Sequence, residues 1–183
     1  MFSRRFPFLL AHPLALTLWL YGPILRLPNV YDTLLHIQIA HGLGWWEAWL
    51  PTPQFGYFRP LVFVPLVTVR EVWGGYPAAV LQTINLLQHS LNVGLVGWLV
   101  WRLWRDERQA VTAALLFATF PFSYQALAIY GNNVHLTILN FVLLGLLGWC
   151  GIGSGGQGSR GAEEQGAGVC RGDCLFCGGV ADA

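Results

Sequence analysis

Long apolar segments separated by short polar ones dominate the first 149 residues of the chain. The first covers residues 6–27 and is long enough to cross the ~30 Å hydrocarbon layer of a membrane as a helix. Gly22-Pro23 is typical of a helix end, and no small-residue cleavage site follows, so we expect an uncleaved span rather than a signal peptide. Arg4 and Arg5 precede this segment and predict a cytoplasmic N-terminus.

Three further spans are predicted, at residues 77–101, 109–127 and 134–149. The apolar segment 61–73 has only thirteen residues, which is too short to cross, so we place it at the outer surface. The span after it then runs inward and carries Arg102, Arg105 and Arg108 to the cytoplasm, as the positive-inside rule favours. The last segment stops after sixteen residues, or about 24 Å of helix, short of the hydrocarbon thickness.

A polar loop at residues 28–61 separates the first two spans. Within it, segment 34–50 mixes apolar residues with His36, Gln38, His41 and Glu47 and ends in a tryptophan cluster. This pattern is typical of a helix that lies in the membrane interface, and Pro51 and Pro53 end it. The sequence therefore predicts an all-α membrane protein with about four transmembrane helices and interfacial helices in the first outer loop.

The composition supports a membrane protein and excludes some partners. Hydrophobic residues make up 55% of the chain, charged residues 10%, and the mean hydropathy is +0.50. Nine tryptophans suit the membrane–water interface. The net charge is +1, so we expect no nucleic-acid partner, because a surface that follows the phosphate backbone of a nucleic acid needs clustered Lys and Arg. No group of carboxylates or histidines has metal-ligand spacing, and we place no metal site and no cofactor on the chain.

Residues 150–183 differ from the rest of the chain. They hold half of the 22 glycines and all four cysteines, and their lack of hydrophobic periodicity predicts a disordered tail after the membrane module 1–149. Two explanations stay open: a flexible cytoplasmic tail, or a frameshift in GC-rich DNA that cuts the fourth span short. Cys170, Cys174 and Cys177 have the spacing of a radical-SAM iron–sulfur motif, but no barrel follows, so we expect no cluster there.

The second predicted span carries a polar stripe. Gln82, Asn85, His89 and Asn92 are three, four and three residues apart, which places them on one face of a helix. Polar groups at membrane depth are costly unless they pair or face water. The stripe either lines a polar cavity, with His89 as its first candidate, or forms hydrogen bonds between helices.

The outer loop holds the candidate catalytic residues. Asp32 and His36 are four residues apart and share a face if the segment is helical. The Asp32 carboxylate could act as a general base toward a hydroxyl, or it could only cap a helix. Arg59 could hold a phosphate through two hydrogen bonds, or could bind lipid headgroups.

The order of these segments resembles that of a known enzyme superfamily. Four stretches carry the resemblance: YDTLLH at 31–36, FRPL at 58–61, NLLQHSLN at 85–92, and AALLFA at 113–118 with Pro121 and Gln125 after it. Together they resemble the GT-C superfamily of integral-membrane glycosyltransferases, especially the protein-mannosyltransferase-like and aminoarabinose-transferase-like bacterial branches.

The resemblance implies transfer of a sugar, with inversion, from a polyprenyl-phosphate donor to an acceptor hydroxyl at the extracytoplasmic face. It makes Asp32 the base, Arg59 the contact to the lipid phosphate, and His36, His89 and Asn85 further polar contacts. Many relatives carry a second acid where this chain has Tyr31, and the family has more spans, so we expect the chain to be inactive alone. The alternative is a small non-catalytic membrane protein, a subunit or transporter fragment, that uses the stripe for packing.

Overall fold

The computed structural model describes residues 6–51 and 58–155, and within these ranges all regular structure is helical. The predicted all-α class is confirmed. The elements are α1 (Phe6–Tyr21), η1 (Gly22–Arg26), α2 (Asp32–His41), η2 (Glu47–Trp49), α3 (Pro60–Trp73), α4 (Ala78–Trp104), α5 (Glu107–Ala118), α6 (Ser123–Ala128), η3 (Tyr130–Asn132) and α7 (Asn133–Gly155).

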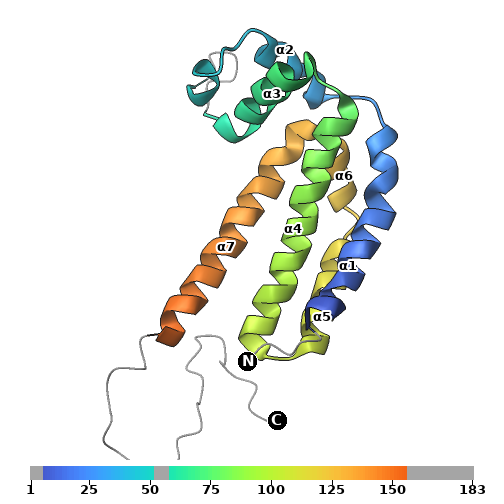
Figure 1. Ribbon diagram of the computed structural model, residues 1–183, viewed down its shortest axis with the longest axis vertical. Helices are drawn as coiled ribbons and strands as arrows, with labels where there is room; N and C mark the ends of the chain where they lie inside the picture. Colours follow the sequence, from blue (N-terminus) through green and yellow to red (C-terminus); the bar gives the residue numbers. More distant parts are fainter. Residues whose placement is uncertain (1–5, 52–57, 156–183) are drawn as a thin grey trace, which may run out of the picture.

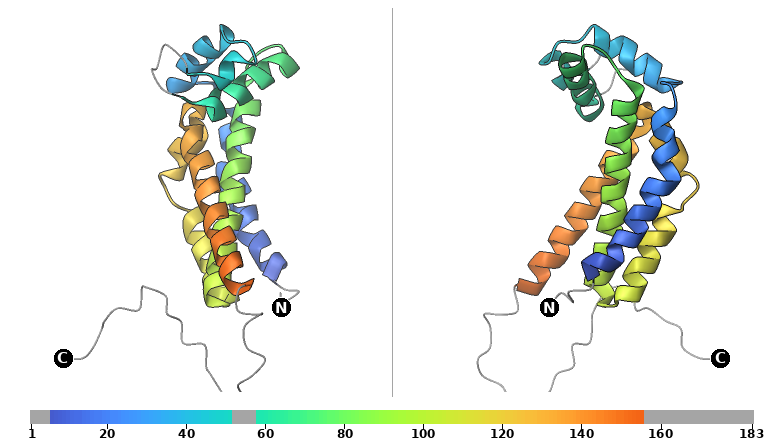
Figure 2. Two further views of the ribbon diagram at one scale, coloured as in Figure 1. Left: turned by 90° about the vertical axis from the view of Figure 1, so that its left-hand side faces the viewer. Right: turned by 45° about the vertical axis from the view of Figure 1, so that its right-hand side comes forward.

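The bundle is formed by α1, α4, α5 with α6, and α7, and each of these runs antiparallel to the one before it in the chain (Figure 1). α4 lies at its centre and contacts α1, α5 and α7. α1 begins, and α4 and α7 end, at the same end of the bundle, while α2 and α3 lie across the opposite end (Figure 2). We call the latter the α2–α3 end. The outer loop of the sequence therefore folds as a layer on top of the bundle.

Two stretches of the described chain are long and apolar enough to cross a membrane: Pro7–Arg26 and Tyr130–Cys150. Only 22% and 28% of these windows are buried inside the protein, unlike the core helix of a soluble domain. α4 has 27 residues, enough to cross, but it carries the polar stripe. The predicted spans at α4 and at α5–α6 stay predictions, as does the interfacial position of α2 and α3.

Charged residues of the described ranges occur only in the segments at the two ends of the bundle. Arg26, Asp32, Glu47, Arg59, Arg70 and Glu71 belong to the α2–α3 end, and Arg102, Arg105, Asp106, Glu107 and Arg108 to the other. Large apolar side chains are exposed on the sides between them, among them Leu18, Trp19, Leu91, Leu116 and Phe141. Exposed apolar surface of this extent is what lipid chains would cover.

The predicted interfacial helix 34–50 is shorter than expected. α2 ends at His41, a loop follows, and η2 is a separate turn. Gly42 and Gly44 interrupt the helix because glycine loses more backbone entropy there than other residues. The loop is held by Glu47, whose Oε2 accepts a hydrogen bond from the Gly44 amide at 2.8 Å.

The predicted continuous span 109–127 is also interrupted. α5 ends at Ala118 and α6 begins at Ser123. Pro121 lies between them, and it lacks the amide that would continue the helical hydrogen bonds. The Tyr21 hydroxyl donates to the Ala118 carbonyl at 3.0 Å, so one carbonyl at the break is satisfied by α1.

The last predicted span is longer than expected. α7 continues beyond residue 149 to Gly155, and the candidate span Tyr130–Cys150 ends one residue after the predicted end but begins earlier than residue 134. Its 21 residues correspond to about 31 Å of helix, enough to cross the hydrocarbon layer. The predicted boundary of the disordered tail therefore lies inside a helix, and the short span no longer supports a frameshift. Cys170, Cys174 and Cys177 lie outside the described residues.

Small residues let α4 approach its neighbours closely. Ala110, Ala114 and Ala118 are fully buried at four-residue spacing along α5. A Cβ placed on Gly97 of α4 would lie 2.6 Å from Leu10 Cδ2 and 3.3 Å from Ala114 Cβ. Close backbone approach through small residues is the usual packing of helices in membranes.

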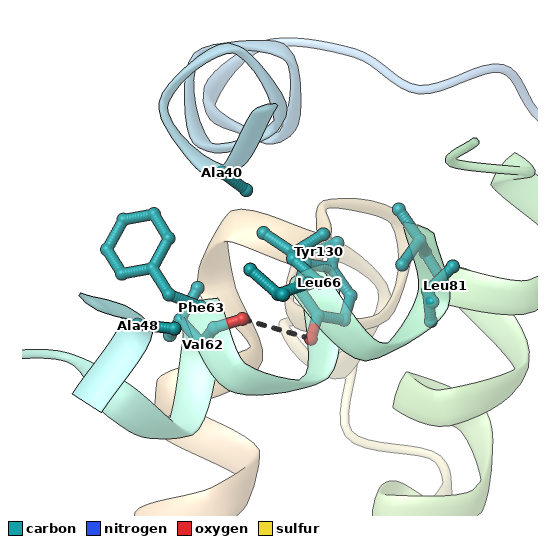
Figure 3. Close-up of a cluster of buried hydrophobic side chains, with 9 residues drawn as sticks. Ala40, Ala48, Val62, Phe63, Leu66, Leu81 and Tyr130 are labelled. Carbon is teal, nitrogen blue, oxygen red and sulfur yellow. Dashed lines mark hydrogen bonds between the residues drawn. The ribbon is translucent and has the colours of Figure 1, made fainter. Parts of the chain in front are cut away.

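An apolar cluster fixes the α2–α3 end to the bundle (Figure 3). Tyr130, from the turn that leads into α7, is 1% exposed and packs among Val62, Phe63 and Leu66 of α3 and Leu81 of α4. Its hydroxyl donates to the Val62 carbonyl at 3.4 Å. The cluster thereby joins α3, α4 and the turn before α7.

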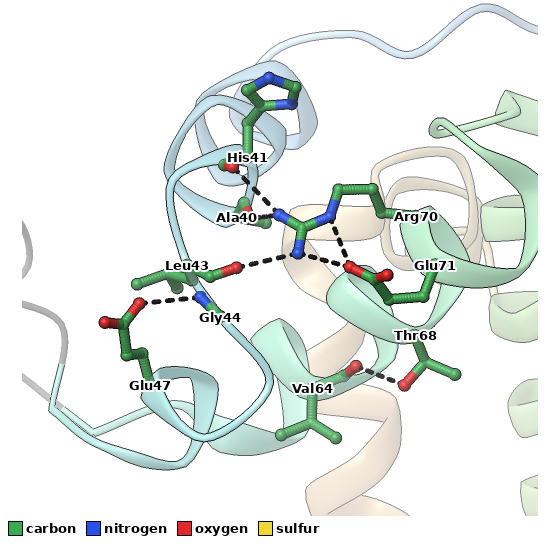
Figure 4. A network of polar contacts seen from close by, with 9 residues as sticks. All are labelled: Ala40, His41, Leu43, Gly44, Glu47, Val64, Thr68, Arg70 and Glu71. Carbon is green, nitrogen blue, oxygen red and sulfur yellow. Dashed lines mark hydrogen bonds and ion pairs between the residues drawn. The ribbon is translucent and has the colours of Figure 1, made fainter.

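Arg70 fixes the end of α2 (Figure 4). Its Nη1 donates to the carbonyls of Ala40 and His41 at 2.8 and 3.0 Å, and its Nη2 donates to that of Leu43 at 3.0 Å. Glu71 Oε1 accepts from the same guanidinium at 2.8 Å. A cation at a helix C-terminus satisfies carbonyls that have no intrahelical partner and interacts favourably with the helix dipole.

Replacing Arg70 with methionine should lower the free energy of unfolding by about 1–3 kcal/mol, because several hydrogen bonds from a charged group are lost. Glu71→Gln is the matched control: its carboxylate is 64% exposed, so it should change stability by less than about 1 kcal/mol. Denaturant unfolding in detergent micelles measures both. Equal effects of the two substitutions would contradict this role of Arg70.

Candidate functional site

Three of the predicted site residues line one pocket at the α2–α3 end. Asp32, His36 and Arg59 share it with Asn132 and His135, and its volume is about 290 Å³. The pocket is bounded by the first turn of α2, the residue before α3 and the start of α7. We call it the Arg59 pocket.

Asp32 is the first residue of α2, and Tyr31 is the capping residue before it. The interpretation of Asp32 as the helix cap is therefore not favoured. A carboxylate in the first turn is nevertheless stabilised by the helix dipole, and the Asp32 side chain is exposed. Tyr31 has φ +50° and ψ −130°, a strained conformation for a bulky residue. The chain thus turns sharply just before the candidate base.

Gly131 packs directly against the first turn of α2. A Cβ on Gly131 would lie 2.7 Å from Asp32 Cβ and 3.1 Å from His36 Nδ1. Its amide donates to Thr33 Oγ1 at 3.4 Å, and Thr33 is 1% exposed. Only glycine permits this approach, so Gly131 positions two site residues. The sequence pattern does not reveal this contact with Asp32.

His36 is buried beneath Asp32, at 3% exposure. Its Nδ1 lies 2.6 Å from the Asp32 carbonyl oxygen, and its ring packs on Phe63. Burial lowers the pKa of His36 below its ordinary value of 6.5; the Asp32 carbonyl opposes this shift, and the charge of Arg59 adds to it. The imidazole is therefore neutral at pH 7, with Nδ1–H donating to the carbonyl and Nε2 as the acceptor nitrogen.

The Arg59 pocket combines opposite charges. Arg59 is half-buried and immediately precedes Pro60, the first residue of α3. His135 projects from the first turn of α7 and is exposed. A guanidinium and an imidazole opposite one carboxylate form a site that can hold an anion while leaving a base beside it.

A second, larger pocket adjoins the first. Its volume is about 590 Å³, and Asp32 and Asn132 line both pockets. Tyr31, Tyr124 and Gln125 form part of its wall. We call it the Tyr124 pocket. Asp32 therefore stands between a pocket with an arginine and a pocket with two tyrosines.

Three of the four stripe residues of α4 form hydrogen bonds to other segments, whereas neither ring nitrogen of the fourth, His89, has a hydrogen-bond partner among the described residues. Gln82 Nε2 donates to the Leu27 carbonyl at 2.9 Å, and Asn85 Nδ2 donates to the Leu127 carbonyl at 3.1 Å. Asn92 Nδ2 donates to the Leu136 carbonyl at 3.0 Å. All three side chains are buried, so the packing interpretation accounts for their polarity.

Asn133 extends this arrangement into α7. Its Nδ2 donates to Asn85 Oδ1 at 2.8 Å, and its Oδ1 lies 3.0 Å from the Thr137 hydroxyl. Thr137 also lies 3.2 Å from Gln88 Oε1. We call these contacts the α4–α7 ladder. No packing role for Asn133 is predicted from the sequence.

His89 lies in the interior of the bundle rather than in either pocket described above. It is fully buried, with Tyr21 edge-on at 5.3 Å and Phe117 at 5.4 Å between ring centroids. Asn85 is likewise interior. The predicted substrate contacts of these two residues stay predictions, and Asp32, His36 and Arg59 are the ones that the structure brings together.

Within residues 6–51 and 58–155, no three His, Cys, Asp or Glu side chains are grouped so that they could hold a metal ion. No protein-family model, curated protein or solved structure matches the chain. The resemblance to GT-C glycosyltransferases therefore stays a prediction, and the geometry of the two pockets carries the functional argument.

Gly131→Ala should lower the free energy of unfolding by about 1–3 kcal/mol, because the added methyl group overlaps the Asp32 side chain. Gly145→Ala in α7 is the matched control. No atom lies within 4 Å of its added Cβ, so this substitution should be neutral or stabilise the helix by up to about 1 kcal/mol. Unfolding in detergent measures both, and identical curves would show that the turn does not pack on α2.

Protonation of His36 should destabilise the fold. Because the pKa of His36 is lower in the fold than its ordinary value of 6.5, the unfolded chain binds this proton more readily. The free energy of unfolding should therefore fall as the pH drops below about 6.5. His36→Gln should make that fall shallower, whereas His41→Gln, at an exposed position of the same helix, should not. Equal pH dependence of both variants would contradict this assignment.

Proposed function

We propose that the chain is a membrane glycosyltransferase module that transfers a sugar from a polyprenyl-phosphate donor to an acceptor hydroxyl. The observation that carries this proposal is the Arg59 pocket, in which an acid, an arginine and two histidines meet at one end of an apolar bundle. A lipid-linked phosphate needs this combination, because its chain stays in the membrane while its charged group requires a cation at the surface.

The charge distribution supports a multi-pass orientation with the α2–α3 end outside the cell. Arg102, Arg105 and Arg108 lie in the segments at the opposite end, where the described part of α1 also begins, and Arg4 and Arg5 precede α1 in the sequence. These five arginines outnumber the three of the α2–α3 end, which are Arg26, Arg59 and Arg70. Basic residues near span ends favour the cytoplasmic side. In this orientation the N-terminus is cytoplasmic, α1, α4, α5–α6 and α7 cross the cell membrane, and α2 and α3 lie at its outer interface.

The proposed reaction is a single displacement. The Asp32 carboxylate takes the proton of the acceptor hydroxyl as its oxygen attacks the anomeric carbon of the sugar. The bond from that carbon to the phosphate oxygen breaks, and the lipid phosphate leaves with the electron pair. Attack opposite to the leaving group inverts the anomeric centre.

Arg59 would stabilise the departing phosphate through charge-assisted hydrogen bonds. His36, neutral and buried, would orient the first turn of α2 and thus Asp32. Asn85 and His89 would act from the interior: Asn85 holds Asn133 at the start of α7, two residues from the Gly131 that contacts Asp32.

One observation favours a different class of function. Three residues of the polar stripe, Gln82, Asn85 and Asn92, form hydrogen bonds to other segments, which suits a small non-catalytic subunit. Such a protein should lose assembly when Asn85 is replaced by leucine and should tolerate Asp32→Asn. A catalytic module should instead lose transfer activity, but keep its fold, when Asp32 is replaced by asparagine.

The proposal is tested in proteoliposomes with a radiolabelled polyprenyl-phosphate sugar. Lipid-phosphate binding is measured on the chain itself, and transfer is measured on the chain joined to the further spans that such enzymes have, because the chain alone is expected to be inactive. Asp32→Asn should reduce transfer by roughly 100-fold to 10,000-fold, as expected when a general base is removed. Arg59→Gln should raise the Kd for polyprenyl phosphate by about tenfold or more, since a charged hydrogen-bond partner is lost.

Two matched controls lie at the same end of the bundle but outside both pockets. Glu47→Gln removes an acid that is bound to the Gly44 amide, and Arg26→Gln removes an exposed arginine. Neither should change transfer or binding. Unchanged lipid-phosphate affinity in Arg59→Gln, or unchanged transfer in Asp32→Asn, would refute the proposal.

A further inference from the structure

We propose that the Tyr124 pocket binds a neutral saccharide, which serves as the acceptor. This inference rests on the proposed function and extends it, because it names the chemical class of the second substrate and the residues that recognise it. The pocket has a volume of about 590 Å³ and shares Asp32 with the Arg59 pocket, but Arg59 does not line it.

The charges in the two pockets differ. In the Arg59 pocket a guanidinium accompanies Asp32, whereas Asp32 is the only charged residue among the described residues that line the Tyr124 pocket. A second anionic ligand would meet a carboxylate there without a compensating cation, which is unfavourable. The occupant of the Tyr124 pocket is therefore neutral.

The polar wall of the Tyr124 pocket suits hydroxyl groups. Gln125 and Asn132 each present a carbonyl acceptor and an amide donor. A sugar hydroxyl both donates and accepts, so it can satisfy either group. A hydrocarbon chain in the same place would cover these amides and Asp32 without hydrogen-bonding them, at considerable cost.

The aromatic wall suits a ring with an apolar face. Tyr31 and Tyr124 are 79% and 52% exposed, yet both line the cavity. A tyrosine ring offers a flat apolar surface with a polar edge, which matches a pyranose, whose C–H groups lie on its faces and whose hydroxyls lie on its rim. Tyrosines and side-chain amides together distinguish a saccharide from a lipid chain.

The shared wall explains how both substrates could meet. Asp32 and Asn132 border both cavities, so a hydroxyl of a saccharide in the Tyr124 pocket can reach the carboxylate while the lipid-linked sugar occupies the Arg59 pocket. Donor and acceptor then meet at the same carboxylate. The same pocket could instead hold the sugar of the donor, and the binding experiment separates these two sources.

The test uses the full chain in nanodiscs and an array of neutral mono- to tetrasaccharides as the probe. The best-bound saccharide is then titrated against variants. Tyr124→Ala and Gln125→Leu should each weaken its binding by roughly tenfold or more, and Tyr124→Phe should retain most of it. Phe122→Ala is the control: Phe122 is 71% exposed and immediately precedes α6, which carries Tyr124 and Gln125, but it does not line the pocket.

Polyprenyl phosphate serves as the second probe. Its affinity should be unchanged in Tyr124→Ala and Gln125→Leu and reduced only in Arg59→Gln. If the unaltered chain binds no saccharide, or if all variants bind it equally, the acceptor assignment is wrong and the proposed function is unaffected. Loss of polyprenyl-phosphate or donor binding in Tyr124→Ala would also overturn the acceptor assignment, by placing the donor in this pocket. Failure of Arg59→Gln to reduce lipid-phosphate binding would instead refute the proposed function.

Discussion

The contact between Gly131 and the first turn of α2 is the constraint on which the site depends. Asp32 and His36 are brought beside Arg59 only because a residue without a Cβ lets the turn before α7 approach α2. Tyr130, the neighbouring residue, anchors the same turn in the apolar cluster under α3. Two adjacent residues therefore connect the outer layer to the bundle, one by apolar burial and one by close backbone approach.

Contacts inside the bundle fix the position of the turn before α7. Asn133 follows it directly and is bonded to Asn85, so the α4–α7 ladder sets where α7 begins. Polar groups buried among apolar helices must pair, because water is not there to replace a lost partner. The polar stripe therefore packs the helices directly, and through Asn133 it also positions the turn beside the Arg59 pocket.

Much of the fold follows from local sequence signals. The apolar lengths placed the helices of the bundle to within a few residues at α1 and α4, and the four-residue spacing of Asp32 and His36 correctly implied a shared helical face. The end of α7 was misplaced because Gly and Cys interrupt the apolar pattern there without ending the helix. Hydrophobic periodicity does not encode contacts between segments that are distant in sequence. The roles of Arg70, Gly131 and Asn133 arise from such contacts and could therefore not be predicted.

The proposed function depends above all on a lipid phosphate binding in the Arg59 pocket. The most direct measurement compares polyprenyl phosphate with the uncharged polyprenol of the same length, each titrated onto the unaltered chain in nanodiscs. Saturable binding of the phosphate, with polyprenol weaker by roughly tenfold or more, is expected if Arg59 holds the charged group. Equal binding of the two lipids would contradict it, because only the hydrocarbon chain would then be recognised.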